Sequence, residues 1–206
     1  MLFPAVVGVL ANNLPCQWSL VIKEPSNISA YIYSMLLSYH TEFLTATILK
    51  WNHLLKQDCY KEIIIDSFEW LATNKKCTIN AFVIMPNHIH LLWKISDGLE
   101  RKNVQGAFFS FTAHQFKKQM KKSDPELLES YCVNKPDRVF QFWKRVPMVK
   151  ECRTEKFFRQ KFNYIHFNPC QAHWDLATAP EDYKWSSANF YERGSIDFKF
   201  LTDLRL

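Results

Sequence analysis

A strand-turn-strand pattern in the middle of the chain most constrains how it can fold. Residues 78–84 and 88–95 are rich in large apolar side chains, and Met85, Pro86 and Asn87 separate the two runs. Proline cannot donate a hydrogen bond to a sheet, and asparagine tolerates the tight backbone angles of a turn. The pattern therefore predicts an antiparallel hairpin around which the rest of the domain packs.

The second strand of this hairpin is predicted to have two different faces. Successive side chains alternate, so His88 and His90 share one face with Leu92 and Lys94. The opposite face is large and apolar, as expected of a core face, and carries Ile89, Leu91, Trp93 and Ile95. Taken alone, a His-x-His pair is more often two histidines on a half-exposed strand. It also has the spacing at which two imidazoles can share one metal ion.

The segments before and after the hairpin show strand and helix patterns. A strand is expected over residues 43–49, followed by a helix over 60–72 with Asp58 as its N-cap. Beyond the hairpin, Asn103 is expected to cap a helix that runs to about Met120. The apolar stripe of that helix consists of Val104, Ala107, Phe108 and Phe111.

The last third of the domain completes the pattern. A polar linker is expected over 123–137, then a last strand over 139–149 that Pro147 interrupts, and a last main helix over 154–168. The resulting order is strand, helix, strand, strand, helix, strand, helix. This order predicts an α+β fold, a ferredoxin-like split βαβ antiparallel sheet with an additional C-terminal helix.

The last helix carries two polar residues at the edge of its apolar stripe. At helical spacing the stripe consists of Phe157, Phe158, Phe162 and Ile165. Tyr164 and Asn168 lie side by side at its edge, one turn apart. A nucleophile and a metal ligand could share this edge. The plainer alternative is that Tyr164 packs at the margin of the core and that Asn168 caps the helix before Pro169.

Composition limits the class of protein. The chain of 206 residues is 48% hydrophobic and 16% aromatic, which predicts a folded domain with a sizeable core. It has only four glycines, so a glycine-rich phosphate-binding loop is not expected. A formal charge of +6 is compatible with a polyanionic partner but is weak on its own. The cysteines form no CxxC pair and are expected to be reduced: Cys16, Cys59, Cys77, Cys132, Cys152 and Cys170.

The expected division of the chain has three parts. Residues 1–40 contain scattered prolines and read as an irregular N-terminal extension, residues 41–192 as the single folded domain, and residues 193–206 as a C-terminal tail. The apolar run over 3–11 lacks the basic residues that begin a signal peptide and is too short to span a bilayer. We therefore expect a cytoplasmic protein without a membrane association.

Four segments together resemble one known family. They are 81–95 (AFVIMPNHIHLLWKI), 108–118 (FFSFTAHQFKK), 161–169 (KFNYIHFNP) and 180–191 (PEDYKWSSANFY). In this order they resemble the REP-associated tyrosine transposases, relatives of the insertion-sequence HUH transposases. The chain departs from the commoner family pattern at 170–174 (CQAHW), where many relatives have a basic residue and then glycine-leucine. That departure concerns sequence preference rather than chemistry.

The resemblance implies a function for each candidate residue. His88 and His90 would be metal ligands, Asn168 a further polar ligand, and Tyr164 the catalytic nucleophile, carried by the additional C-terminal helix. The enzyme would be a metal-dependent transposase that nicks and rejoins single-stranded, hairpin-containing DNA through a 5′-phosphotyrosine intermediate. The cofactor implied is Mg²⁺ or Mn²⁺, although two imidazoles also suit zinc or nickel. A tyrosine phenol has a reference pKa of about 10, so it has to lose its proton as it attacks.

The sequence indicates a nucleic-acid partner and is compatible with two other functions. The expected partner is single-stranded or hairpin DNA, and the protein is expected to be a monomer or a homodimer. One alternative is a non-catalytic single-stranded DNA-binding or regulatory protein on the same fold. Another is a zinc-dependent hydrolase, which would need a carboxylate base near the histidines.

Basic residues expected to contact phosphates are Lys117, Lys118, Lys121, Lys122, Lys144, Arg145 and Arg153, with Lys156 and Arg159 as further members. Residues 180–191 are expected to form a strap that packs Tyr183 and Trp185 on the core.

Overall fold

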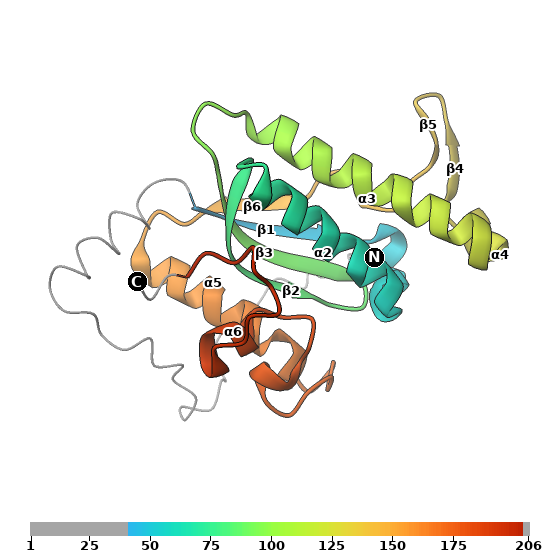
Figure 1. Cartoon of the computed structure of the whole chain (residues 1–206). Helices are drawn as coiled ribbons and strands as arrows, with labels where there is room; N and C mark the ends of the chain where they lie inside the picture. Colours follow the sequence, from blue (N-terminus) through green and yellow to red (C-terminus); the bar gives the residue numbers. More distant parts are fainter. Residues whose placement is uncertain (1–40, 204–206) are drawn as a thin grey trace, which may run out of the picture.

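The computed structural model describes residues 41–203 of the chain, and the extension expected over 1–40 lies outside them. Strands and helices follow one another in the expected order, with small additions after the second long helix (Figure 1). The strands are β1 (Thr41–Thr47), β2 (Cys77–Ile84), β3 (His88–Ile95), β4 (Cys132–Lys135), β5 (Arg138–Phe140) and β6 (Met148–Glu151). The α-helices are α2 (Asp58–Thr73), α3 (Arg101–Ser123), α4 (Pro125–Glu129), α5 (Glu155–Phe167) and α6 (Ala188–Arg193).

The main sheet has four strands in the order β2-β3-β1-β6, all paired antiparallel. Its two halves are β1-α2-β2 and β3-α3-β6, which is the ferredoxin-like split βαβ arrangement. Helix α5 follows the last strand and is the additional C-terminal helix. The predicted fold class is confirmed.

Helices cover both faces of the sheet. Helices α2 and α3 lie on one side of it and α5 and α6 on the other (Figure 1). On the first side, Phe68 of α2 packs against Phe82 of β2 and Phe108 of α3, with ring centroids 5.6 and 5.5 Å apart. Leu91 is paired with Phe82 and shares this face. The apolar face of β3 is a core face, as predicted.

The histidine face of β3 is also covered. Helix α5 packs over it, and both His88 and His90 are buried. The half-exposed strand considered from the sequence is therefore not what the chain forms. Sequence alternation assigned the two faces correctly, but whether a second helix layer covers the polar face is a tertiary property.

Two predicted helix caps are wrong. Gln57 precedes α2, and Asp58 lies in the first turn, where it forms an ion pair with Lys61 at 2.7 Å. Helix α3 begins at Arg101, so Asn103 lies inside it. The guanidinium of Arg101 binds the buried carboxylate of Glu42 on β1, and this contact ties the start of the helix to the sheet.

The apolar stripe of α3 was predicted correctly in part. Its buried side chains are Val104, Phe108, Thr112, Phe116 and Met120, whereas Phe111 is exposed. The stripe therefore follows spacings of four residues along the whole helix.

The polar linker and the single last strand expected over 123–149 are also wrong. This region contains α4, which Asp124 caps by accepting a hydrogen bond from the Leu127 amide at 2.9 Å, and then the separate hairpin β4-β5. Pairing with β1 begins only at Met148, directly after Pro147. Because proline has no amide proton for the ladder, β6 begins only after Pro147, and the expected strand contains parts of two strands that belong to different sheets.

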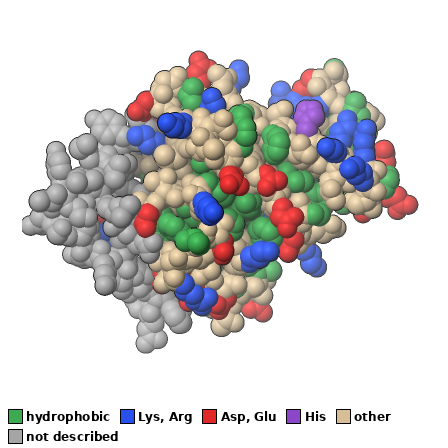
Figure 2. Space-filling model, in the orientation of Figure 1, with side chains coloured by type: hydrophobic (Ala, Val, Ile, Leu, Met, Phe, Trp, Pro, Cys, Tyr) green, Lys and Arg blue, Asp and Glu red, His purple; other side chains and the backbone are tan. Residues whose placement is uncertain are grey.

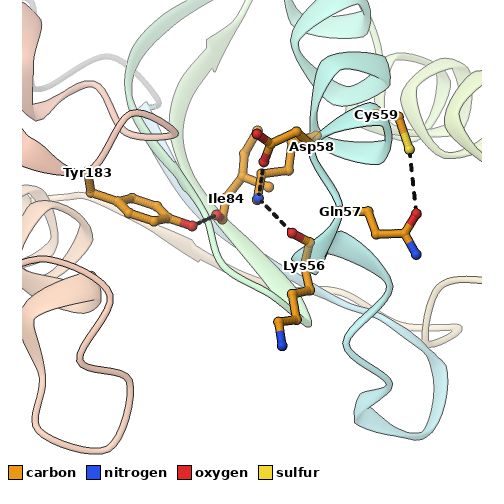
Figure 3. A network of polar contacts seen from close by, with 7 residues as sticks. Lys56, Gln57, Asp58, Cys59, Ile84 and Tyr183 are labelled. Atoms are coloured by element: carbon orange, nitrogen blue, oxygen red, sulfur yellow. Dashed lines mark hydrogen bonds and ion pairs between the residues drawn. The ribbon is translucent and has the colours of Figure 1, made fainter.

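The C-terminal segment protects the edge of the sheet at β2. Tyr183 donates a hydrogen bond to the carbonyl of Ile84 at 2.8 Å (Figure 3). The Ile84 amide donates in turn to the carbonyl of Trp185 at 2.9 Å. Tyr183 and Trp185 are buried, so the predicted strap is confirmed. Beyond it, Phe198 and Phe200 pack against Phe82, with ring centroids 5.0 and 5.8 Å away. None of the described helices is long and apolar enough to cross a membrane.

Candidate active site

A pocket of about 590 Å³ opens between the histidine face of the sheet and α5. It brings together all four residues that sequence analysis assigned to catalysis and metal binding, namely His88, His90, Tyr164 and Asn168. Its other lining residues are Phe43, Thr45, Thr47, Trp51, Val146, Met148, Lys161, Gln171, His173 and Trp174. Residues from distant parts of the sequence thus meet in one place.

Each histidine is oriented by a hydrogen bond at its Nδ1 atom. Nδ1 of His88 lies 2.6 Å from Oδ1 of Asn87, and Nδ1 of His90 lies 2.8 Å from the hydroxyl of Thr45. Because an amide oxygen only accepts, Nδ1 of His88 carries the proton and Nε2 keeps its lone pair. The two rings are 4.6 Å apart. Hydrogen bonds of this kind commonly fix the orientation of metal-binding imidazoles.

Both imidazoles are held in the neutral form. Burial, with a smaller effect of the neighbouring His173, lowers the pKa of His88 to about 4. Burial also holds the pKa of His90 well below its usual value, with added effects from His88 and Lys161. At neutral pH each ring therefore keeps one nitrogen lone pair, which is the form that binds metal ions.

Helix α5 places the tyrosine at the mouth of the pocket. Its N-terminus is capped by Thr154, which accepts a hydrogen bond from the Phe157 amide at 3.2 Å. The buried residues Phe158, Phe162 and Ile165 hold the helix on the sheet, as the predicted stripe required. Tyr164 lies at the edge of that stripe, partly exposed, with its ring 5.0 Å from the ring of His90.

Two buried polar atoms in the pocket lack a hydrogen-bond partner among residues 41–203. They are Nε2 of His90 and Oδ1 of Asn168. A buried polar group without a partner costs about 1–3 kcal/mol, so such atoms call for an explanation. A nitrogen lone pair and an amide oxygen, together with Nε2 of His88, are chemically suited to a divalent metal ion.

The ligand set would have to include the amide of Asn168. Within residues 41–203, no group of three or more His, Cys, Asp or Glu side chains is placed to hold a metal ion. Asn168 is buried at the end of α5, one turn beyond Tyr164. Asn168 is the C-cap residue of α5, as the plainer interpretation expected, and its backbone amide donates to the carbonyl of Ile165. Its side-chain oxygen takes no part in this cap and is left free to act as a ligand.

Sequence reasoning missed several pocket residues. Lys161 lies three residues before Tyr164, and its ammonium is 5.4 Å from the centre of the Tyr164 ring. Helical spacing could have found this residue. Thr45 is placed opposite His90 by strand register, and Trp51 and Trp174 arrive from irregular segments. For these three residues the local sequence carries no signal.

The predicted phosphate contacts fall into separate groups. Lys117, Lys118, Lys121 and Lys122 lie in the C-terminal half of α3, on the opposite side of the sheet from α5, and Figure 2 shows basic side chains gathered at that end of the molecule. Lys144 and Arg145 directly precede the pocket residues Val146 and Met148. Arg153 is exposed and paired with Glu151 at 2.9 Å, and Arg159 with Glu155 at 2.7 Å.

A ferredoxin-like sheet with paired histidines facing a helix-borne tyrosine fits a transposase-like, DNA-processing protein, and a comparison with protein families supports this class. The model described as "Transposase IS200 like" matches residues 35–135, which include both histidines. The matched segment is just under half of the chain, and over it the chain is similar to the IS200-like transposases. Tyr164 and Asn168 lie beyond the matched segment.

A solved structure shares the fold. The structure of the REP-associated tyrosine transposase bound to a REP hairpin is similar with a TM-score of 0.55 and 18% identity, over 81% of this chain and 88% of the other. A candidate transposase from Deinococcus radiodurans R1 has a TM-score of 0.40 and 20% identity, over 62% and 89% of the two chains. No curated protein matches the chain.

Proposed function

We propose that the protein is a metal-dependent single-stranded DNA transesterase that cleaves and rejoins hairpin-containing DNA through a 5′-phosphotyrosine intermediate. The observation that carries this proposal is the position of Tyr164. Its ring lies against His90, in a pocket where the buried Nε2 of His90 and Oδ1 of Asn168 have no partner among the described residues. A nucleophile and a set of unused ligand atoms therefore face the same space.

His88, His90 and Asn168 would hold the metal ion, Mg²⁺ or Mn²⁺ by family resemblance. Once bound, such an ion polarises the scissile phosphate and offsets its negative charge. Thr45 and Asn87 keep the imidazole rings oriented through their Nδ1 atoms. The protein thus holds both rings neutral and oriented before the substrate arrives.

The hydroxyl of Tyr164 would attack the phosphorus atom of one phosphodiester. A bond forms between phosphorus and the tyrosine oxygen, and the bond from phosphorus to the 3′ oxygen breaks. The phenol proton passes to water, and the leaving 3′ oxygen takes up a proton to become a free 3′-OH. In the reverse direction a 3′-OH of another strand attacks the phosphotyrosine and releases Tyr164, which rejoins the DNA without any external energy source.

Lys161 would assist by electrostatics. Its ammonium lies over the rings of Phe43, Phe157 and Tyr164, at 5.0, 5.2 and 5.4 Å from their centres. A positive charge at this distance favours the negative charge that develops on the attacking oxygen and on the phosphate. No aspartate or glutamate lines the pocket in the described part of the chain. This weighs against hydrolysis, which would need a carboxylate base near the histidines.

The DNA partner is proposed from the basic residues and from the solved relative, which binds a REP hairpin. Lys144 and Arg145, which directly precede the pocket residue Val146, would contact phosphates near the pocket, and the lysines of α3 would contact a more distant part of the DNA, such as the stem of a hairpin. The intact set of His88, His90, Tyr164 and Asn168 supports an enzyme rather than a non-catalytic binding protein.

One experiment tests the proposal. The full chain is incubated with Mn²⁺ and a panel of hairpin oligonucleotides carrying single-stranded flanks, labelled either upstream or downstream of the cut. A downstream label should appear in a denaturation-resistant protein-DNA band, and an upstream label should be released with a free 3′-OH. The same reaction with Tyr164→Phe should bind DNA and form no band. An adduct on Tyr183 or Tyr191, or full cleavage by Tyr164→Phe, would refute the assignment.

A further inference from the structure

Large exposed apolar side chains gather at the rim of the pocket. Trp51 is 56% exposed and Val146 80% exposed, and Met148 is exposed beside them. All three line the pocket together with Tyr164. Single exposed apolar residues are ordinary on a protein surface, but a group of them around one opening marks a binding site.

The backbone that presents Trp51 is strained. Lys50 and Trp51 both have positive φ angles, of 56° and 61°. A left-handed conformation costs a residue other than glycine free energy, and consecutive examples persist only where the surrounding structure imposes them. Lys50 lies three residues beyond the end of β1, and Trp51 follows it and lines the pocket.

The same turn that orients a histidine also holds this strained segment. The Asn87 side chain accepts from Nδ1 of His88 through Oδ1, at 2.6 Å, and donates to the carbonyl of Trp51 through Nδ2, at 3.4 Å. The backbone carbonyl of Asn87 accepts from the Ile48 amide at 2.8 Å. The position of the indole is thereby coupled to the position of the imidazole.

The charge around the indole indicates what it binds. The ammonium of Lys144 lies 3.8 Å from the centre of the Trp51 ring, and Lys144 is not among the residues that line the pocket. Of the pocket-lining residues in the described part of the chain, none is acidic and Lys161 is basic. The fitting occupant is an anion with flat apolar faces, which describes a nucleotide of an unpaired strand.

We propose that Trp51 is a stacking platform for one unpaired base of the strand that Tyr164 cuts. The inference rests on the proposed function and adds a base-binding subsite to it. The base packs on the open part of the indole, and its phosphate lies toward Lys144. Stacking reads no particular base, because every base has an aromatic face, so the platform would position the strand rather than select its sequence.

Binding without metal separates this subsite from the cleavage reaction. The full chain is titrated in EDTA with a fluorescently labelled oligothymidine of about 12 nucleotides, and with a strand of equal length whose sugars carry no bases. The first probe offers bases and phosphates, and the second offers phosphates alone. Neither measurement depends on Tyr164, so a missing covalent adduct would leave this result standing.

Three variants make the test specific. Trp51→Asn removes the ring and keeps a residue that tolerates a positive φ, so the fold should persist, as a thermal melt would verify. Trp51→Phe keeps a smaller ring. Trp70→Ala removes an equally exposed indole from α2, on the other side of the sheet.

We expect Trp51→Asn to weaken oligothymidine binding at least about fivefold and to leave binding of the base-free strand unchanged, with Trp51→Phe in between and Trp70→Ala like wild type. Wild-type affinity of Trp51→Asn for oligothymidine would overturn the proposal. An equal loss for both probes would do so too, because it would assign Trp51 to the phosphates. A change from dimer to monomer in Trp51→Asn, without loss of oligothymidine binding, would assign the rim to a second copy of the chain.

Discussion

The hydroxyl of Thr45 lies 2.8 Å from Nδ1 of His90, because the antiparallel register of β1 and β3 places these two residues opposite each other. In the proposed metal site this hydrogen bond directs Nε2 of His90 into the pocket. The strand that lies next to β3 thus contributes to the site without contributing a ligand.

Thr45→Val should therefore weaken metal binding while the fold persists. The substitution keeps the branched shape and removes the hydrogen bond, and loss of such a contact typically lowers metal affinity about ten- to hundredfold. Titration of Mn²⁺ by calorimetry measures the effect. Thr47→Val is the matched control, since Thr47 faces the same pocket from the same strand and makes no hydrogen bond to His90. Equal losses in both variants would mean that the hydroxyl of Thr45 has no special role.

Replacement of both histidines should abolish metal binding and cleavage. His88→Ala/His90→Ala removes two of the three proposed ligands. Because both side chains are buried beneath α5, we also expect the free energy of unfolding to fall by about 1–3 kcal/mol. It would stay unchanged if the two histidines lay on a strand face outside the core. Urea unfolding and Mn²⁺ titration on the same sample separate the two effects. Metal binding and DNA cleavage that survive in this folded double variant would show that the metal assignment is wrong.

How far the sequence predicted the fold depends on how local each signal was. The bounds of β3 agree residue for residue, because alternation and the proline turn are both local. The caps at Asp58 and Asn103 were misplaced, since a capping residue is defined by backbone angles that the sequence does not specify. The strand expected over 139–149 combined segments of two different sheets, and local apolar character cannot tell which partner a strand has.

The candidate site was predictable to a different extent. Tyr164 and Asn168 could be proposed because Asn168 follows Tyr164 by one turn at the end of one helix, and His88 and His90 because both lie on one strand. Which helix faces which strand is decided by packing, so the proximity of the tyrosine to the histidines rested on resemblance alone. Thr45 and Trp51 escaped notice for the same reason: each reaches the pocket through strand register or a strained turn.

Two groups of basic residues should contribute to the affinity for different forms of DNA. We expect wild type to prefer single-stranded or hairpin DNA to plain duplex, with an affinity that falls steeply with salt. Replacing Lys144 and Arg145 by alanine should lower the slope of log affinity against log salt for a single strand by about 1.4, or roughly 0.7 for each phosphate contact. Replacing Lys117, Lys118, Lys121 and Lys122 should weaken hairpin binding instead. Equal effects of both sets on a plain single strand would contradict this division.

The stability of the metal-free protein should decrease in mild acid. His166 is buried against the hydroxyl of Ser187, at 2.8 Å, and burial lowers its pKa to about 3. In the unfolded chain a histidine has a pKa of about 6.5. Above that pH both states are neutral and His166 has no effect. Below it only the unfolded chain takes up the proton, so stability falls by up to ~1.4 kcal/mol per pH unit until the folded state also titrates near pH 3. His88 adds a similar loss between about pH 6.5 and its folded pKa of about 4.

Urea unfolding at a series of pH values from about 7 to about 5 measures this slope. His166→Asn keeps a polar group that can bond to Ser187 and removes the titration, so its stability should vary less with pH than that of wild type. Identical slopes for the two proteins would show that His166 is not the group responsible.

Lys161 should affect the chemical step more than DNA binding. Lys161→Met keeps an unbranched apolar stem against Phe43 and Phe157 and removes the charge beside Tyr164. Without that charge the developing negative charge on the tyrosine oxygen and the phosphate is less stabilised, and we expect the single-turnover rate of adduct formation to fall about tenfold or more. Affinity for oligothymidine in EDTA, to which many phosphate contacts contribute, should change by less than about threefold. Lys161→Arg, which restores a positive charge, should recover part of the rate.

Lys150→Met is the matched control, because Lys150 is exposed on β6 and is absent from the pocket lining. If Lys161→Met instead lost DNA affinity and kept the wild-type rate, Lys161 would be a phosphate contact and would have no part in stabilising the attacking oxygen.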